Sequence, residues 1–191
     1  MFYDFSHRHS PCTVEGESDI VILSRETRAT TIIGKEYLYN GVFAPTSPVK
    51  VGDLVETDES FLVQTMRSTT EKDKYCSLIK TNVLIDIQRY AQRYDSNDNP
   101  IGAPSFNPVQ INVKGYAQYV TARLRQDEAG LLPTTVYILQ LQTTAGVKDP
   151  QDESLVSPDR IVMGGKPYQV DAVDRVKYPN LYHLQLSEDV R

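Results

Sequence analysis

The feature that most constrains this chain is a series of short segments in which apolar and polar side chains alternate. Val83, Ile85 and Ile87 are two residues apart and would share one face of a strand. The same alternation occurs in three further stretches, 111–114, 136–141 and 181–186. A period of two is typical of a half-buried β-strand, because successive side chains of a strand point to opposite faces. In the last stretch we expect Tyr182, Leu184 and Leu186 to face the core and His183 to face outward.

Turn signals separate these segments and complete the prediction of fold class. Asn40-Gly41 is the pair favoured in a tight hairpin, and Gly164-Gly165 lies between two strand-like runs. Only 121–129 favours a short helix, which Gly130 would end. We therefore expect a mainly β fold, a small barrel or sandwich with a long loop excursion and little helix. The chain would be a single domain over 1–191, with an N-terminal arm at 1–12.

Composition narrows the classes of function. The chain has 191 residues and a net charge of −5, with no apolar run of the roughly 18 residues that a membrane-spanning helix needs. Its N-terminus lacks the basic start and apolar run of a signal peptide, which indicates a cytoplasm-like compartment. A mildly acidic protein is a poor candidate for binding DNA through phosphate contacts. It remains suited to lining a channel through which DNA slides.

No pattern of residues predicts a reaction. His7, His9 and Cys12 resemble part of a metal site, but no fourth ligand is suggested nearby. The second thiol, Cys76, is too distant in sequence to complete a metal motif. Neither a phosphate-binding glycine motif nor a nucleophile elbow is present. We therefore expect no enzyme activity, no cofactor and no metal.

The segment 95–108 differs from its surroundings, because it has three prolines and many turn-forming residues. We expect a long loop there, and such loops are often functional. Two interpretations remain open, a surface insertion and a loop that reaches a partner or a channel. The second is favoured by two apolar side chains among the polar ones. The candidate contact residues are Asp95, Asn97, Asp98, Asn99, Ile101 and Phe106.

A weak internal repeat appears when the chain is shifted by 107 positions, which places Val49–Val63 over Val156–Val170. Leu54 then matches Ile161 and Phe61 matches Tyr168. Each copy has the pattern of strand, turn, strand, loop, strand. Two interpretations are open: any two β-meanders look alike, or the repeat reflects a duplication or a pseudo-symmetric barrel.

Two segments match sequence patterns of a known protein family. The first, Asp159-Arg-Ile-Val-Met-Gly-Gly-Lys-Pro-Tyr-Gln-Val-Asp-Ala-Val-Asp174, resembles the C-terminal hairpin of the head-completion proteins of tailed bacteriophages, also called head-closure or stopper proteins. The second, Val51-Gly-Asp-Leu-Val-Glu-Thr-Asp-Glu-Ser-Phe-Leu-Val-Gln-Thr65, resembles a stretch found in related neck and tail proteins. The resemblance covers about a third of the chain.

The resemblance implies a small β-barrel that assembles into a homo-oligomeric ring. The ring would lie in the virion, between the portal or adaptor and the tail, after assembly in the host cytoplasm. It would close the DNA channel without reading the DNA sequence, and 95–108 would narrow that channel. Alternatives are another tail component (tail terminator, hub or baseplate protein) and a non-catalytic β-barrel binding module.

A ring needs two complementary surfaces on every subunit. Aromatic residues of the N-terminal arm, Phe2, Tyr3 and Phe5, are candidate subunit contacts, because aromatic side chains are common anchors at interfaces. The segment 187–191 would supply a polar rim.

Overall fold

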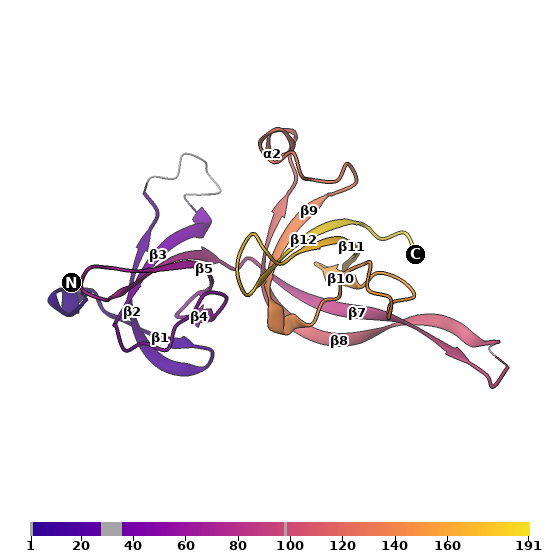
Figure 1. Cartoon of the computed structure of the whole chain (residues 1–191), viewed down its shortest axis with the longest axis horizontal. Coiled ribbons are helices and arrows are strands. Elements are labelled where there is room, and N and C mark those ends of the chain that lie inside the picture. Colours follow the sequence, from indigo (N-terminus) through magenta and orange to yellow (C-terminus); the bar gives the residue numbers. More distant parts are fainter. Residues whose placement is uncertain (1, 28–35, 98) are drawn as a thin grey trace. The chain divides into compact units, whose positions relative to one another are not determined.

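The computed structural model describes residues 2–27, 36–97 and 99–191 and is mainly β, as the alternation predicts. Its strands form two closed barrels (Figure 1). The first compact unit comprises Met1–Asn82 and Arg175–Leu181, and the second comprises Val83–Asp174 and Tyr182–Arg191. The sequence predicted one β-rich domain over 1–191. Two units form instead, because each barrel buries its own set of apolar side chains.

The first barrel has the strand order β1-β2-β3-β6-β5-β4 and closes where β4 pairs with β1. All its neighbouring strands are antiparallel. A 3₁₀ helix, Tyr3–Arg8, precedes it. Its strands are β1 (Ser10–Val14), β2 (Glu17–Arg25), β3 (Leu38–Phe43), β4 (Leu54–Glu56), β5 (Ser60–Ser68) and β6 (Lys74–Lys80).

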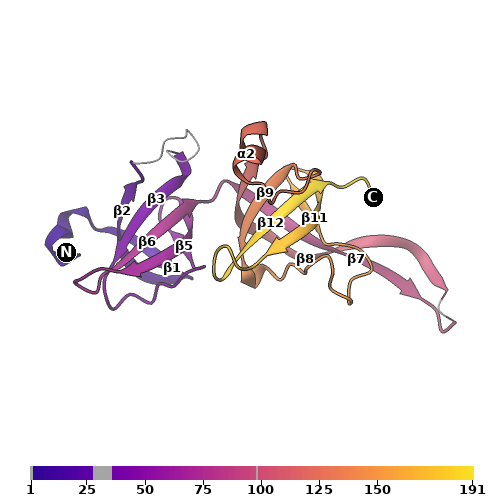
Figure 2. The same cartoon turned by 45° about the horizontal axis from the view of Figure 1, so that its top comes forward.

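The second barrel has the order β10-β11-β12-β9-β8-β7 and closes where β10 pairs with β7. Figure 2 shows β11 and β12 of this barrel side by side. A short helix, α2 (Ala122–Asp127), and a 3₁₀ turn, Thr143–Ala145, flank β9. The side-chain oxygen of Thr121 accepts a hydrogen bond from the Leu124 N–H and caps α2. The strands are β7 (Val83–Tyr94), β8 (Pro100–Tyr119), β9 (Tyr137–Gln142), β10 (Arg160–Met163), β11 (Lys166–Asp174) and β12 (Leu181–Glu188).

Adding six to each strand number of the first barrel gives β7-β8-β9-β12-β11-β10. This is the strand order of the second barrel read from its other end. An equivalent aromatic pair lies in both cores. The rings of Tyr39 on β3 and Phe61 on β5 meet edge to face at 5.0 Å between centroids. The rings of Tyr137 on β9 and Tyr168 on β11 do so at 5.3 Å. The repeat seen in the sequence therefore corresponds to two barrels of one topology, as a duplication predicts.

The repeated strands also share an irregularity, but their alignment needs a small correction. The pairing of β5 with β6 shifts between Val63 and Thr65, and that of β11 with β12 shifts between Val170 and Ala172. The two bulges lie 107 positions apart from each other, as the repeat predicts. In the preceding strands, however, Val55 rather than Leu54 is the equivalent of Ile161. Val55 pairs with Phe61 as Ile161 pairs with Tyr168, because the two turns differ in length.

The glycine signals had different outcomes. Gly164 and Gly165 have φ of +57° and +77° and form the turn between β10 and β11, as predicted. Asn40 and Gly41, in contrast, lie within β3 and do not form the predicted hairpin turn. Gly41 is needed for packing: a Cβ there would lie 2.8 Å from Cδ1 of the buried Leu78.

Two predictions of which face a side chain occupies were wrong. Ile111 was expected to share a face with Val113, but it is exposed, because Asn112 adopts a φ of +56° and interrupts the alternation. His183 was expected to face outward but is buried. The excursion around α2 covers part of this strand, since Gln185 accepts a hydrogen bond from the Leu132 N–H and donates one to the Gly130 carbonyl.

Candidate functional site

The most distinctive element is a β-hairpin that extends beyond the second barrel (Figure 1). We call residues 89–107 the projecting hairpin. The barrel strand β10 pairs with β7 only from Ile85 to Gln88, and β9 pairs with β8 only from Tyr116 to Tyr119. From Arg89 onward the described residues of β7 pair with β8 alone. The predicted loop over 95–108 is therefore wrong for most of its length, since residues 100–108 belong to β8.

Pro100 is compatible with this strand, because among the described residues the outer part of β8 pairs with β7 alone. Asp95 donates its N–H to the Asn99 carbonyl, so the next cross-strand pair, Tyr94 and Pro100, is not hydrogen bonded. The Pro100 nitrogen, which has no hydrogen, therefore faces away from β7. Proline occurs in strands at such edges and at bulges, and it discourages the addition of another strand.

Three of the predicted contact residues build the tip of the projecting hairpin. The Asp95 carboxylate accepts hydrogen bonds from the Asn97 N–H at 2.8 Å, the Asn99 N–H at 2.9 Å and the Asn99 amide at 3.1 Å. The bonds from the Asn99 N–H and amide, followed by that from the Asn97 N–H, lower the pKa of Asp95. The tip is therefore a self-contained polar turn. Asp98 lies outside the described residues.

The other two predicted contact residues lie on β8 and have different environments. Ile101 is 52% exposed beside the tip. Phe106 lies at the base of the projecting hairpin, where its ring meets the ring of Tyr90 edge to face at 5.6 Å. The Cζ atom of Arg160 is 3.5 Å from the centroid of the same ring, and that of Arg191 is 5.0 Å from it. Phe106 is thus a structural contact of the base and Ile101 is available to a partner.

Arg89 on β7 makes a second contact that holds the base of the projecting hairpin. Arg89 donates from Nε and Nη2 to the two carboxylate oxygens of Asp159, both at 2.8 Å, and from Nη2 to the Gly146 carbonyl at 3.0 Å. The Asp159 side chain is fully buried and also accepts the Lys148 N–H. Hydrogen bonding to Asp159 raises the pKa of Arg89. A bidentate pair of this kind fixes direction as well as distance.

Residues 187–191 were expected to supply a polar rim, and one of them, Asp189, makes contacts within its own unit. The Asp189 side chain is fully buried, and its oxygens accept hydrogen bonds from Arg160 Nε at 2.7 Å and from Arg191 Nε and Nη2 at 2.8 Å each. We call Arg160, Asp189 and Arg191 the arginine clasp. Burial alone would raise the pKa of Asp189, but the hydrogen bonds from Arg191 and Arg160 outweigh it and hold the pKa far below its usual range.

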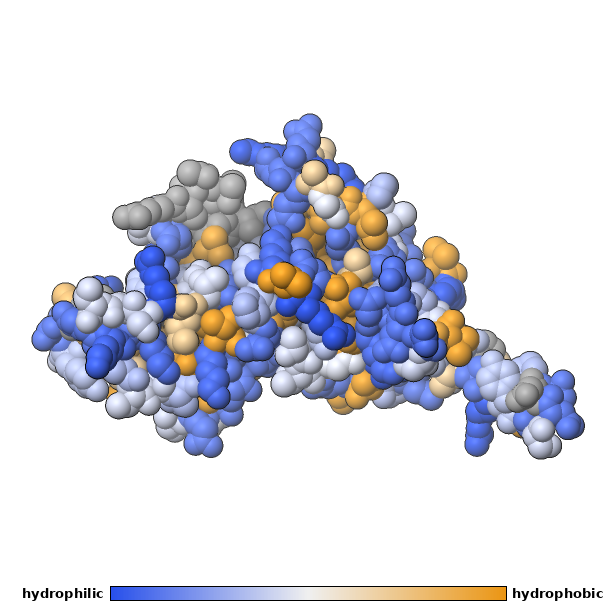
Figure 3. All heavy atoms as spheres, viewed as in Figure 1, coloured by the Kyte–Doolittle hydropathy of each residue, from blue (hydrophilic) through white to orange (hydrophobic). Residues whose placement is uncertain are grey.

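Exposed apolar side chains are concentrated on the whole length of β7 and β8, of which the projecting hairpin is the outer part. Among the described residues, six of the fourteen large hydrophobic side chains that are exposed lie on β7 and β8: Leu84, Tyr94, Ile101, Val109, Ile111 and Tyr119. The outer part of the projecting hairpin is nevertheless mostly hydrophilic on the face drawn in Figure 3. Single apolar side chains in a polar setting suit an element that is stable in water and can still bury contacts in an assembly.

The N-terminal aromatic residues are not equivalent to one another. Phe2 is only 3% exposed and packs with Ile22 and Val42, while its N–H donates to the buried Asp73 carboxylate at 2.9 Å. Tyr3 and Phe5 are exposed at 66% and 40%. Of the three predicted subunit contacts, Phe2 therefore belongs to its own barrel, and only Tyr3 and Phe5 remain available.

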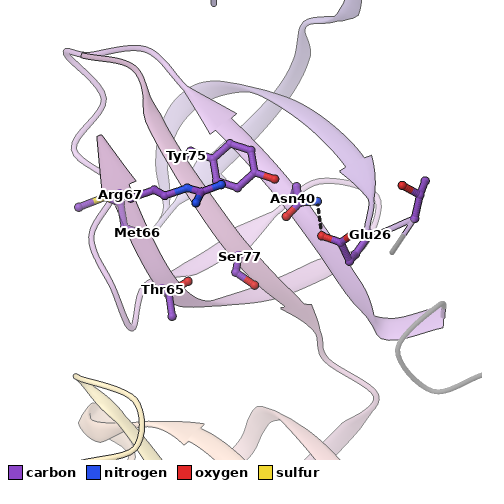
Figure 4. A pocket seen from close by; sticks show the side chains of 8 residues that line it. Glu26, Asn40, Thr65, Met66, Arg67, Tyr75 and Ser77 are labelled. Carbon is purple, nitrogen blue, oxygen red and sulfur yellow. Dashed lines mark hydrogen bonds between the residues drawn. The ribbon is translucent and has the colours of Figure 1, made fainter. Parts of the chain in front are cut away.

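A polar hollow of about 590 Å³ lies on the outer face of the first barrel (Figure 4). The Arg67 guanidinium lies 4.6 Å from the centre of the Tyr75 ring, and Asn40 donates to Glu26 at 2.9 Å. The full lining consists of Glu26, Thr27, Asn40, Thr65, Met66, Arg67, Tyr75 and Ser77. An aromatic ring beside a cation is a combination that binds nucleobases.

Cys12 and Cys76 are buried in the first barrel, and burial raises the pKa of each thiol to about 12. In the part of the chain that the structure describes, no three His, Cys, Asp or Glu side chains are grouped to hold a metal ion. Within the same residues, no helix is both long and apolar enough to cross a membrane.

Comparison with models of known protein families gives no match for this chain. Comparison with curated proteins gives no significant match.

The arginine clasp and the Arg89–Asp159 pair are the site residues that sequence reasoning missed. Their partners are far apart in sequence: 70 positions separate Arg89 from Asp159, and 29 separate Arg160 from Asp189. The one signal available was the adjacent pair Asp159-Arg160, which opens the segment that resembles head-completion proteins. In the structure Asp159 contacts the base of the projecting hairpin through Arg89, and Arg160 contacts it through the Phe106 ring.

Proposed function

We propose that this chain is a structural subunit of a tailed-bacteriophage neck. It would form a homo-oligomeric ring between the portal or adaptor and the tail. The proposal is supported by the resemblance of 159–174 and 51–65 to head-completion and neck proteins. These segments form equivalent β-hairpins, β10-β11 and β4-β5, in two closed barrels. Closed barrels leave few strand edges for uncontrolled association, as a protein that assembles by defined contacts requires.

The observation that carries the proposal is the projecting hairpin. A hairpin that leaves its own barrel cannot bury its apolar side chains there, and a single isolated hairpin is only marginally stable in water. Here two arginine–carboxylate contacts hold the base, and the free part exposes Tyr94 and Ile101. An element of one subunit that contacts a different surface of the next subunit makes a head-to-tail interface, and such interfaces form a ring when the rotation between neighbouring subunits closes.

The charge of the chain supports the second part of the proposal. A net charge of −5 repels the phosphate backbone, so that DNA can pass through a ring without being retained. Closing the channel then requires a segment that narrows it by size. The polar tip around Asp95 and Asn99 is the candidate for that segment.

The first test is a shortened hairpin. Residues 92–104 are replaced by Asn-Gly, which joins Ala91 to Ser105; these two residues face each other across the strands. The ring contact between Tyr90 and Phe106 at the base of the hairpin is kept. We expect wild-type protein to form rings, visible by electron microscopy and as one discrete mass in mass photometry. The shortened variant should remain a folded monomer.

A point variant and a matched control accompany this test. Ile101→Asp should reduce assembly, because a charge would replace an apolar contact. Val156→Asp introduces the same charge at a 75% exposed position of the same unit, outside residues 89–107, and should assemble normally. Rings of unchanged stoichiometry from the shortened variant would contradict the role given to the hairpin.

Other virion positions use the same kinds of contact, and a tail terminator, hub or baseplate protein is the nearest alternative. Labelling the protein in an intact particle decides among these positions. A label found between the portal or adaptor and the tail supports the neck, and a label at the far end of the tail contradicts it.

A second candidate function is a nucleic-acid-binding module, favoured by Arg67 over Tyr75 in the polar hollow. The measurement is a fluorescence titration with single-stranded DNA at low salt. Saturable binding that is lost in Arg67→Ala would support this candidate. Absence of binding to the wild-type protein would exclude it.

A further inference from the structure

The base of the projecting hairpin and the residues 189–191 are joined through one aromatic ring. Phe106 belongs to the hairpin, and the Arg160 and Arg191 guanidinium groups approach its ring to 3.5 Å and 5.0 Å. A cation over an aromatic face is attracted by the ring's negative face, and more strongly when both are partly buried. Phe106 is paired with Tyr90 on the opposite strand, so this contact restrains both strands of the hairpin.

Both guanidinium groups are positioned by a single carboxylate. Asp189 binds Arg160 and Arg191 through its two oxygens, and its own side chain has no exposed surface. Arg191 is further fixed by its N–H, which donates to Asp189 at 2.9 Å, and by Nη1, which donates to the Pro158 carbonyl at 3.2 Å. Arg160 in turn donates from Nη2 to the Arg191 carbonyl at 2.9 Å. Loss of the Asp189 charge would therefore release both cations from the ring.

We propose that residues 189–191 control the projecting hairpin: the arginine clasp holds its base in one direction and so pre-organises it for contact with a second copy of this chain. This inference rests on the proposed function, because it concerns the same hairpin. An element ordered before binding loses less conformational entropy when it binds, and its affinity for the partner is higher for that reason. The Arg89–Asp159 pair fixes β7 independently, so loosening of the clasp should act first on β8.

The test measures opening of the hairpin in the unassembled protein. Trypsin cleaves after Arg93, and cleavage within a paired strand requires local opening. We expect Asp189→Asn to be cut at Arg93 roughly tenfold faster than wild type at a protein concentration too low for assembly. Hydrogen–deuterium exchange should show lower protection in 100–107 and unchanged protection in β9 and β12, which establishes that the second barrel of the variant is folded.

The matched control is Asp127→Asn. It removes the carboxylate of an exposed pair with Arg123 in the same unit, where the two groups lie 3.9 Å apart. Its cleavage rate should equal that of wild type. A second variant, Phe106→Leu, removes the aromatic ring but leaves the clasp intact, and it should also accelerate cleavage at Arg93.

Wild-type cleavage and exchange rates in both Asp189→Asn and Phe106→Leu would overturn the inference. Because these readouts use the monomer, they do not depend on the proposed ring. Faster cleavage with unchanged ring assembly would support control of the hairpin and contradict its role at the subunit interface. Faster cleavage with weaker assembly supports both.

Discussion

At Gly41 in the first barrel and Gly115 in the second, a core side chain lies close to the backbone of a strand. A Cβ at Gly41 would lie 2.8 Å from Leu78 Cδ1, and one at Gly115 would lie 2.5 Å from Leu141 Cδ2. Both leucines are fully buried, so neither can move without disturbing its neighbours. These glycines therefore serve packing, although neither has a positive φ.

Replacing Gly41 by alanine should lower the free energy of unfolding by about 1–3 kcal/mol, the usual cost of overpacking a core. Gly130→Ala is the control, because a Cβ there meets no atom within 4 Å and the backbone is not left-handed. That variant should be as stable as wild type or slightly more stable. Urea unfolding of the two variants gives the comparison, and equal midpoints would contradict the packing role.

Asp189 makes stability depend on pH in one direction. Its pKa in the folded protein lies below the ordinary value of 3.8, so the folded state binds its proton less tightly than the unfolded state. Stabilisation by this group is therefore complete above about pH 4 and is lost as the pH falls toward the folded pKa.

We expect Asp189→Asn to be less stable than wild type by about 3 kcal/mol at pH 7, because it breaks a buried ion pair. The difference should shrink as the pH falls below about 4. Urea unfolding curves for both proteins, measured at steps from pH 7 to pH 3, give the difference directly. A difference that grows on acidification would mean that the clasp does not hold the charged carboxylate.

At the scale of elements, alternation predicted the strands whose neighbours are regular. Ile85 and Ile87 are buried on β7, and Tyr182, Leu184 and Leu186 are buried on β12, as expected. The outer half of the β7–β8 hairpin could not be predicted in this way. Both its faces are open to solvent, so no apolar period marks it, and its pairing shifts between Ala91 and Arg93. Prolines that normally indicate a loop lie there on a free edge.

The same reasoning explains which site residues were found. Asp95, Asn97 and Asn99 were identified because a turn is a local structure with a local composition. The arginine clasp was missed because its ion pairs join β10 to the segment after β12, and burial of Asp189 depends on the closure of the whole barrel. A lone Asp-Val-Arg sequence contains none of that information.

At the scale of the whole molecule, the two barrels have separate cores. Phe61 belongs to one cluster of buried residues and Tyr168 to the other, although they occupy equivalent positions. Each cluster buries its own side chains, so a defect in one core should weaken that barrel first.

We expect Phe61→Leu to raise hydrogen exchange in residues 10–80, and Tyr168→Leu to raise it in residues 83–174, each at a cost of about 1–2 kcal/mol. Segment-resolved exchange of the two variants makes the comparison. If either substitution raised exchange equally in both halves, the barrels would be one cooperative unit.

The common strand order has a consequence for how such a molecule can change over evolutionary time. In the first barrel the strands that correspond to β7 and β8 are only five and nine residues long, against twelve and twenty in the second. The α2 excursion and the projecting hairpin both belong to the second barrel. Among the described residues the longer strands lie in the second barrel, while the strand order is the same in both barrels. The β7–β8 hairpin can therefore change in length while the strand order of both barrels stays the same. Related proteins should differ most in length at this hairpin.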